Sequence, residues 1–296
     1  MNLGSRPSRT PEPRKRSLTD GNPAYPGGVT LRLAAVVEGN QDGETIVFVQ
    51  GWPDDASLWD GAVAALRDTY RCVRVTLPNF GGDRTARWGY STAEIVDALA
   101  DLIRDAGRGT PVTLVMHDWG CYWGHAVHHR YPDRVARVAG VDIAPHFRAS
   151  SFGAIAGIVS YQLWLWAAFV IGGPIGDWMT RRLAKLALVP AETTRLTAWM
   201  NYPYRNIWTD ILAGRDRKLV EGYWPNCPLL FVYGEKKPFH FHGAAWVDHV
   251  RKVGGEVVAL PCGHWVPREP SFVDVLHRWL KKHAVPRAPA SSAVPD

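Results

Sequence analysis

Cysteine is scarce in this chain and follows no recognisable pattern. The four cysteines are widely spaced, with none in a CxxC pair or at a metal-ligand spacing from histidine: Cys72, Cys121, Cys227 and Cys262. That spacing excludes a structural zinc site of the usual kind. Scattered single thiols are typical of reduced compartments, so we expect a cytoplasmic protein.

Uninterrupted apolar runs of membrane-spanning length are also missing. The stretch from residue 149 to residue 176 carries no charge. Glycine and proline interrupt it at Gly153, Gly157, Gly172, Gly173 and Pro174. A transmembrane helix needs about 20 predominantly apolar residues in sequence. We therefore expect buried helices, some forming the wall of a pocket, and keep peripheral membrane contact as the alternative.

The chain also lacks a large excess of one charge. It has 34 basic and 28 acidic residues, a net charge of +6, and five of the basic residues lie within the first sixteen positions. The other charges are mixed, so nucleic-acid binding is not expected. The basic, proline-rich start has no apolar run behind it and does not resemble a secretion signal. We expect residues 1–28 and 285–296 to be disordered tails.

Hydrophobic residues make up 46% of the chain, which is enough for a large core. Helical patterns separate short apolar runs at 31–37, 45–49, 72–77, 112–116, 137–144, 229–233 and 256–260. This alternation predicts an α/β fold with a mostly parallel central sheet and helices on both faces. A Trp-rich helical stretch interrupts it. We therefore expect two core segments, 29–146 and 217–284, and an inserted helical cap, 147–216.

The most informative stretch runs from His117 to Gly120. It follows the apolar run 112–116 and precedes a segment, 121–130, with the pattern of a helix. A carboxylate at such a turn can attack alkyl carbon and form an ester, which water must then cleave. Asp118 is the candidate nucleophile. The competing interpretation is an ordinary aspartate that caps a helix.

This strand, turn and helix resemble the nucleophile elbow of the α/β-hydrolase superfamily, in the branch of the epoxide hydrolases and haloalkane dehalogenases. The resemblance covers about residues 30 to 283. It implies that Asp118 is the nucleophile and that Gly120 gives the backbone the clearance that a strained turn needs. Met116 departs from the family, because epoxide hydrolases usually have glycine there, and its bulk would crowd the turn.

The stretch from Gln50 to Pro53 resembles the His-Gly-X-Pro loop of the superfamily. The resemblance implies that the backbone N–H groups of Trp52 and Trp119 form an oxyanion hole and that the peptide before Pro53 is cis. Gln50 stands where the family has histidine. Because glutamine can both donate and accept hydrogen bonds, the packing of the loop could survive this change.

His264 follows the last apolar run and a glycine, where the family has its catalytic histidine, so it is the candidate general base. Epoxide hydrolases usually place its acid partner soon after the strand at 229–233, where this chain has Lys237. A lysine cannot stabilise an imidazolium. We expect the acid to be Asp142, which ends the strand after the nucleophile helix, as in many haloalkane dehalogenases. Glu235 is the second candidate, and a structural cap is the alternative for Asp142.

Opening an epoxide requires a proton donor beside the leaving oxygen, and tyrosine can donate without being ionised at rest. The stretches 161–164 and 202–206 resemble the two cap-tyrosine motifs of soluble epoxide hydrolases. The resemblance implies that Tyr161 and Tyr204 are these donors. The alternative for each tyrosine is ordinary amphipathic packing.

A haloalkane dehalogenase needs halide donors instead. That family commonly uses the tryptophan after the nucleophile, here Trp119, together with a cap tryptophan or with an asparagine where this chain has Trp52. The cap tryptophans Trp164, Trp166 and Trp199 therefore keep dehalogenation as an alternative. We expect Trp52, Trp119 and Trp164 to contact the substrate.

Together these motifs predict a hydrolase that opens an epoxide to a vicinal diol through an ester on Asp118, which water activated by His264 then cleaves. This chemistry requires no metal or cofactor. The apolar cap predicts a small lipophilic substrate. Haloalkane dehalogenation is the alternative reaction. Because Gln50 and Lys237 depart from the family, a degraded hydrolase that only binds a ligand is the alternative to an enzyme.

Overall fold

The computed structural model describes residues 31–80, 87–146, 151–190, 192–214 and 219–284. The predicted tails, 1–28 and 285–296, lie outside the described residues. Within the described residues the sheet has seven strands: β1 (Ala34–Gly39), β2 (Thr45–Val49), β3 (Arg71–Thr76), β4 (Val112–His117), β5 (Val135–Val141), β6 (Leu229–Gly234) and β7 (Glu256–Leu260).

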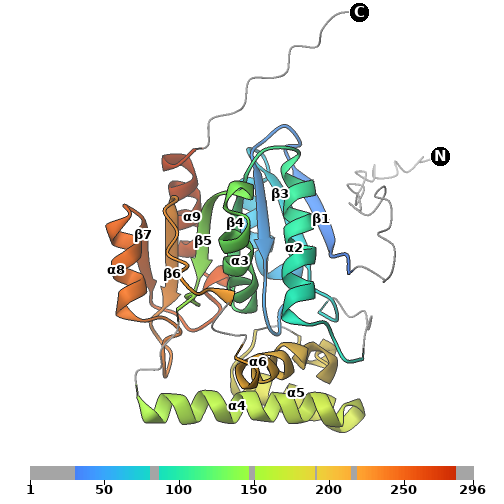
Figure 1. The fold of residues 1–296 in the computed structure, drawn as a ribbon. Helices are drawn as coiled ribbons and strands as arrows, with labels where there is room; N and C mark the ends of the chain where they lie inside the picture. Colours follow the sequence, from blue (N-terminus) through green and yellow to red (C-terminus); the bar gives the residue numbers. More distant parts are fainter. Residues whose placement is uncertain (1–30, 81–86, 147–150, 191, 215–218, 285–296) are drawn as a thin grey trace, which may run out of the picture.

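The described helices of a full turn or more flank this sheet or lie beyond its end (Figure 1). They are α1 (Asp60–Leu66), α2 (Thr92–Gly107), α3 (Trp119–Arg130), α4 (Phe152–Ile171), α5 (Gly173–Leu186), α6 (Tyr202–Leu212), α8 (Ala244–Lys252) and α9 (Pro270–Lys282). Short 3-10 turns at 56–59, 132–134, 193–195, 198–201 and 266–268 join some of them.

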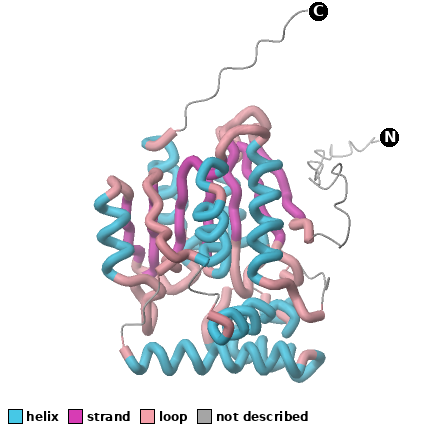
Figure 2. The backbone as a smooth tube through the Cα atoms, viewed as in Figure 1, coloured by secondary structure: helices cyan, strands magenta, loops and turns pink. Residues whose placement is uncertain are grey.

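The strand order is β1-β3-β2-β4-β5-β6-β7, and every neighbouring pair is parallel except β1 with β3. β2 and β4 lie in the middle, and all of their residues are buried, as expected for strands covered on both faces. Figure 2 shows helices on both faces of the strands. The predicted α/β fold with a mostly parallel sheet is therefore confirmed.

Two hydrophobic clusters, one on each face, hold the sheet between its helices. One cluster joins α2, α3 and α8 to the sheet through residues such as Leu99, Trp123 and Trp246. The other joins α1 and α9 through Leu66 and Trp279. Because β2 to β7 are parallel, their carboxyl ends lie at the same end of the sheet, and the loops that follow them can carry catalytic residues.

Helices α4, α5 and α6 form a separate layer, called here the helical layer, at the carboxyl ends of the parallel strands (Figure 1). α4 is the outermost helix of this layer. Gly153 and Gly157 lie inside α4 and do not interrupt it, whereas Gly172 ends it. The expectation that this stretch is buried is wrong for one side of α4, because only 28% of its most apolar window is buried. By length and composition alone, α4 could also cross a membrane.

Candidate active site

The turn between β4 and α3 holds Asp118 in an unusual backbone conformation, with φ 53° and ψ −124°. L-residues rarely adopt positive φ, so the surrounding packing must enforce it. Two glycines make room for the turn. A Cβ atom on Gly120 would lie 2.3 Å from the carbonyl oxygen of Val49, and one on Gly51 would lie 2.3 Å from Oδ1 of Asp118. The turn therefore presents its carboxylate only because both neighbours lack a side chain.

Met116 does not crowd this turn, contrary to the expectation from its size. Its side chain is fully buried and packs against α3 at Gly124. A Cβ atom on Gly124 would lie 2.0 Å from the Met116 sulfur. The missing side chain on the helix therefore accommodates the additional bulk on the strand.

The loop from Gln50 to Pro53 brings a backbone donor to the carboxylate. The N–H of Trp52 donates to Oδ1 of Asp118 over 2.7 Å, and the peptide before Pro53 is cis, as predicted. A Cβ atom on Gly51 would also lie 2.3 Å from the backbone nitrogen of Trp119, which is as close as it would lie to Oδ1 of Asp118. One backbone N–H group, that of Trp52, thus donates where negative charge would develop on Oδ1, and the nitrogen of Trp119, the predicted second donor, lies close by.

Gln50 is fully buried, and within the described residues its side-chain amide has no hydrogen-bond partner. An amide buried in this way costs stability relative to a paired one. The loop nevertheless keeps the geometry of Trp52 described above, so the replacement of histidine does not displace the backbone donor.

His264 lies between the nucleophile Asp118 and the predicted acid Asp142 and contacts both. His264 Nε2 lies 3.4 Å from Oδ2 of Asp118, and its Nδ1 donates to Oδ2 of Asp142 over 2.5 Å. Asp142 is fully buried immediately after β5, whereas Glu235 is exposed. The structure therefore brings Asp142, and not Glu235, to the imidazole.

Lys237 stands where epoxide hydrolases usually have the acid, and here it forms an ion pair with Oδ1 of the acid Asp142. The backbone N–H of Gly234 donates to the same oxygen over 3.1 Å. Both oxygens of Asp142 are thus engaged, one by cationic Lys237 and one by His264. Burial alone would raise the pKa of Asp142, but these partners hold that pKa well below its usual range. Asp142 is therefore a fixed negative charge.

The same charges act on His264. Burial would lower the pKa of its imidazole, but the charge of Asp142 and the hydrogen bonds to Asp118 and Asp142 outweigh burial and raise the pKa to about 9. At neutral pH the resting site is therefore an imidazolium between two carboxylates. If Asp118 lost its negative charge, its contribution to the raised pKa would disappear, and His264 would more readily release its proton and become free to accept one from water.

This raised pKa predicts a pH dependence of stability. Between pH 6.5, the usual pKa of histidine, and pH 9, the folded protein holds a proton that the unfolded chain has released. The contribution of His264 is thus complete below pH 6.5 and is lost as the pH rises through 9. We expect the free energy of unfolding to fall by roughly 3 kcal/mol across this window from this group.

Denaturant unfolding of the native protein and of His264→Gln, measured at several pH values across that window, checks this expectation. Because other titrating groups are shared, only the difference between the two slopes counts. Parallel slopes would mean that the imidazole is not held protonated in the folded state.

Two buried residues that the sequence did not single out hold the His264 loop in place. His117, whose pKa burial lowers to about 4, is neutral, and its Nε2 donates to the carbonyl oxygen of His264 over 2.9 Å. Asp54 accepts from the indole of Trp265 over 2.8 Å and from Arg268 over 3.2 Å. The position of His117 beside the nucleophile was a usable signal, whereas Asp54 had none.

The two predicted tyrosines lie together in the helical layer next to Asp118. Their ring centroids are 6.0 Å apart, and Tyr204 packs edge-on against Trp119 at 5.2 Å and Trp52 at 5.7 Å. Burial raises the pKa of both hydroxyls, and the charge of Asp118 raises it further. Both tyrosines are thus neutral and can donate protons.

The three tryptophans expected to contact substrate have different surroundings. Trp119 lines the cavity beside Asp118, and its side chain is hydrogen-bonded to Tyr204. Trp52 is not among the lining residues, and its Nε1 donates to Asn201 over 2.8 Å. Trp164 does not line the cavity either; its Nε1 donates to the carbonyl oxygen of Met179 over 2.9 Å. In the structure, substrate contact through Trp52 or Trp164 side chains is therefore not supported.

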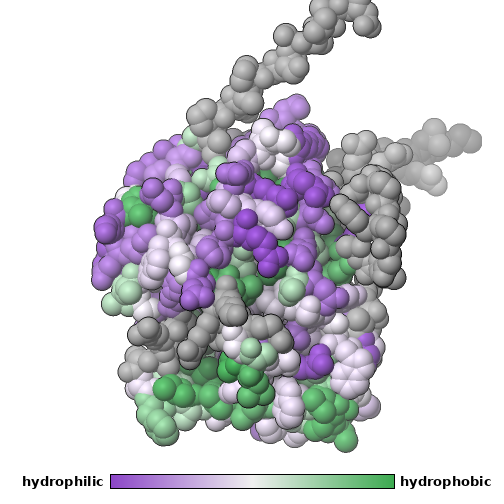
Figure 3. Space-filling view, viewed as in Figure 1, coloured by the Kyte–Doolittle hydropathy of each residue, from purple (hydrophilic) through white to green (hydrophobic). Residues whose placement is uncertain are grey.

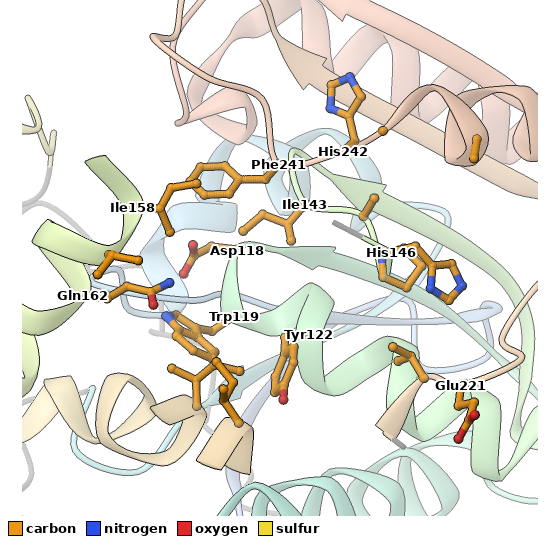
Figure 4. Close-up of a pocket in the computed structure, with 18 of the residues that line it drawn as sticks. Asp118, Trp119, Tyr122, Ile143, His146, Ile158, Gln162, Glu221, Phe241 and His242 are labelled. Atoms are coloured by element: carbon orange, nitrogen blue, oxygen red, sulfur yellow. The ribbon is translucent and has the colours of Figure 1, made fainter. Parts of the chain in front are cut away.

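A cavity of about 1520 Å³ opens at Asp118 and runs between the helical layer and the loops after β5 and β6. Its walls are largely apolar; they include Ile143, Ile158, Trp208, Trp224 and Phe241. Figure 4 shows Asp118 near Ile143, Phe241 and Gln162, with His146 and Glu221 lying farther along the cavity. Tyr161 lines it, whereas Tyr204 does not. A long apolar molecule can therefore reach the carboxylate.

Residues 44–269, most of the chain, match the family model described as alpha/beta hydrolase fold. A carboxylate at a strand-to-helix turn, contacted by a backbone N–H donor and by a histidine paired with an acid, is the arrangement that this fold supports. The chain therefore belongs to the α/β-hydrolase fold family.

Solved structures with the same fold include enzymes of two activities. Epoxide hydrolase A from Mycobacterium thermoresistibile is 22% identical with a TM-score of 0.62, and the match covers 84% of this chain and 94% of that one. A loop variant of haloalkane dehalogenase DbeA from Bradyrhizobium elkanii is 17% identical with a TM-score of 0.62, covering 84% and 93%. At these identities the likeness concerns the fold.

A sequence relative comes from Mycobacterium tuberculosis and bears the name probable oxidoreductase EphD. It is 36% identical over 120 residues, which are 39% of this chain and 20% of EphD. The match thus spans about a fifth of the length of that relative.

Proposed function

We propose that this protein is an epoxide hydrolase that works through an ester on Asp118. The proposal rests on two neutral tyrosines, Tyr204 buried and Tyr161 half-buried at the cavity, that lie within the electrostatic reach of a carboxylate already in contact with a backbone donor and His264. The nucleophile and its relay serve several reactions in this fold, but a proton donor at this place is needed only when the leaving atom is oxygen.

In the first step, Oδ2 of Asp118 attacks an epoxide carbon, and the ring C–O bond breaks. Oδ1 accepts from the N–H of Trp52, which leaves Oδ2, 3.4 Å from Nε2 of His264, as the oxygen without a backbone donor. Tyr161, which lines the cavity, gives its proton to the oxygen of the opened ring, and the phenolate later recovers a proton from the solvent-connected site. Tyr204 does not line the cavity, and its ring packs against that of Tyr161 and holds this donor in position.

In the second step, the new ester is cleaved at the carboxyl carbon of Asp118. Ester formation removes the negative charge 3.4 Å from His264, so the pKa of the imidazole falls and the ring releases its proton to water, which balances the proton that the Tyr161 phenolate recovers. Neutral His264 then takes a proton from water, whose oxygen attacks the ester carbon. The N–H groups of Trp52 and Trp119 stabilise the oxyanion on Oδ1, and its collapse releases the diol as the leaving oxygen takes the proton from His264.

The surroundings of the indoles make haloalkane dehalogenation the weaker candidate. A departing halide needs N–H donors that are free to turn toward it. Here the side chains of Trp52, Trp119 and Trp164 are engaged by Asn201, Tyr204 and Met179, respectively. Holding a halide with any of these three indoles would require breaking such a contact, whereas Tyr161 already lines the cavity beside Asp118.

Replacing Tyr161 with phenylalanine tests the proposal. We expect the rate of epoxide opening to fall about 100-fold, because positioned proton donors contribute at least this much. The matched control is Tyr122→Phe on α3. Tyr122 lines the same cavity, but in Figure 4 its hydroxyl points away from Asp118. We expect that variant to stay within about threefold of the native rate.

The measurement is the rate at which an aromatic epoxide disappears in a single turnover, because ring opening consumes the epoxide before any diol is released. Equal rates for the two variants would contradict a proton-donor role. Release of halide from a haloalkane at the native rate by Tyr161→Phe, without any epoxide turnover by the native protein, would favour the dehalogenase instead.

A further inference from the structure

The outer side of α4 is apolar where a surface helix is normally polar. Within the described residues, the side of α4 that faces away from the sheet exposes Phe152, Leu163, Trp166 and Val170, at 86%, 44%, 41% and 45%. Its opposite side buries Leu165 and Phe169. A helix that is apolar all round is normally enclosed by protein or lipid. The described residues leave this side of α4 open.

Exposed apolar side chains are concentrated around this helix. Of the fifteen large hydrophobic residues that the described chain exposes, twelve lie in the helical layer. On α5 they include Ile175 at 64% and Trp178 at 58%. Figure 3 shows the apolar side chains gathered at the end of the molecule that α4 and α5 form. Contiguous apolar surface of this kind marks an interaction site.

Basic residues border this surface at the far end of α5. Residues 151–190 contain three basic residues and one acidic residue. Arg182 and Lys185 are exposed, whereas the acidic residue, Asp177, is half-buried and accepts from the backbone N–H of Ala198. The exposed charge beside the apolar surface is therefore positive. Tryptophan, aliphatic and basic side chains on one surface are the composition of helices that lie in a lipid interface.

We propose that the outer surface of α4 and α5 docks on an anionic lipid bilayer, with α4 lying in the interface and not crossing it. The inner side of α4 argues against crossing, because it carries Tyr161 and Ile158 into the cavity and packs on α5 and α6. The helix is about 30 Å long, so its whole outer side can lie flat on the lipid. This proposal is independent of the reaction proposed above.

The docking would also place the cavity next to its supply of lipophilic molecules, an extension that does rest on the proposed function. Ile158, Val159 and Gln162 on α4 line the cavity from the side opposite the lipid surface. A lipophilic epoxide dissolved in the bilayer would then need to cross only the thickness of the helical layer to reach Asp118.

Flotation with vesicles tests the docking without any substrate. The probes are vesicles of phosphatidylcholine mixed equally with phosphatidylglycerol, and vesicles of phosphatidylcholine alone. The full-length native protein is expected to float with the mixed vesicles. Leu163→Glu/Val170→Glu puts two acidic groups on the outer side of α4 and is expected to weaken binding at least about tenfold. Arg182→Ala/Lys185→Ala is expected to weaken binding to the anionic vesicles about 30-fold.

The matched control is Ala64→Glu/Ala65→Glu, which adds the same two charges on exposed positions of α1. It should float like the native protein, and near-ultraviolet circular dichroism should show all variants folded. The basic residues within the first sixteen positions are common to every variant, so they cannot produce a difference. Failure of the native protein to float, or equal flotation of the α4 variant, would overturn the proposal. So would a native dimer that the α4 substitutions dissociate without any binding to vesicles.

Discussion

Replacing Asp118 with asparagine is expected to reduce epoxide turnover by at least about 10,000-fold, because the amide cannot form the ester on which both steps depend. Asparagine has nearly the same shape, and its side-chain oxygen can still accept from the N–H of Trp52, which donates over 2.7 Å in the native protein. The loss should therefore be chemical and not structural.

Ligand binding distinguishes a chemical loss of activity from a structural one in Asp118→Asn. An unreactive apolar ligand of the cavity should bind Asp118→Asn about as tightly as the native protein, because the walls of the cavity do not change. Equal loss of turnover and of ligand binding would point to a distorted turn. Native turnover in this variant would remove Asp118 from the reaction altogether.

Replacing His264 with glutamine is expected to cause the second large loss of turnover. We expect ring opening to continue and ester cleavage to stop, because Oδ2 of Asp118 can still attack but no base remains for the water. Steady-state turnover should fall at least about 1,000-fold, and one equivalent of the ester on Asp118 should accumulate per protein molecule. A burst of epoxide consumption followed by a halt is the kinetic signature.

Much of the fold and of the catalytic site could be predicted from the sequence, because local patterns determine them. Apolar runs of strand length that alternate with helical segments predict a parallel sheet, and the residues at the ends of those strands must meet at one edge. Asp118, Asp142 and His264 each follow such a strand. Their convergence therefore depends on the topology of the sheet, and the alternation of strands and helices along the sequence already predicts that topology.

Other features depend on contacts between distant residues, which no local pattern records. The pairing of Lys237 with Asp142 joins residues 95 positions apart. The fit of Met116 against Gly124 depends on how α3 packs on β4, and the engaged indole of Trp164 depends on how α5 packs on α4. Composition alone suggested that α4 is buried, but burial depends on what lies on each side of a helix.

Intact-mass spectrometry of His264→Gln shows whether an epoxide becomes esterified to Asp118. After incubation with an aromatic epoxide, we predict a mass increase equal to the whole epoxide, located on the peptide that contains Asp118. The double variant Asp118→Asn/His264→Gln should remain unmodified. An unchanged mass with every epoxide offered, or an adduct that persists in the double variant, would contradict the account.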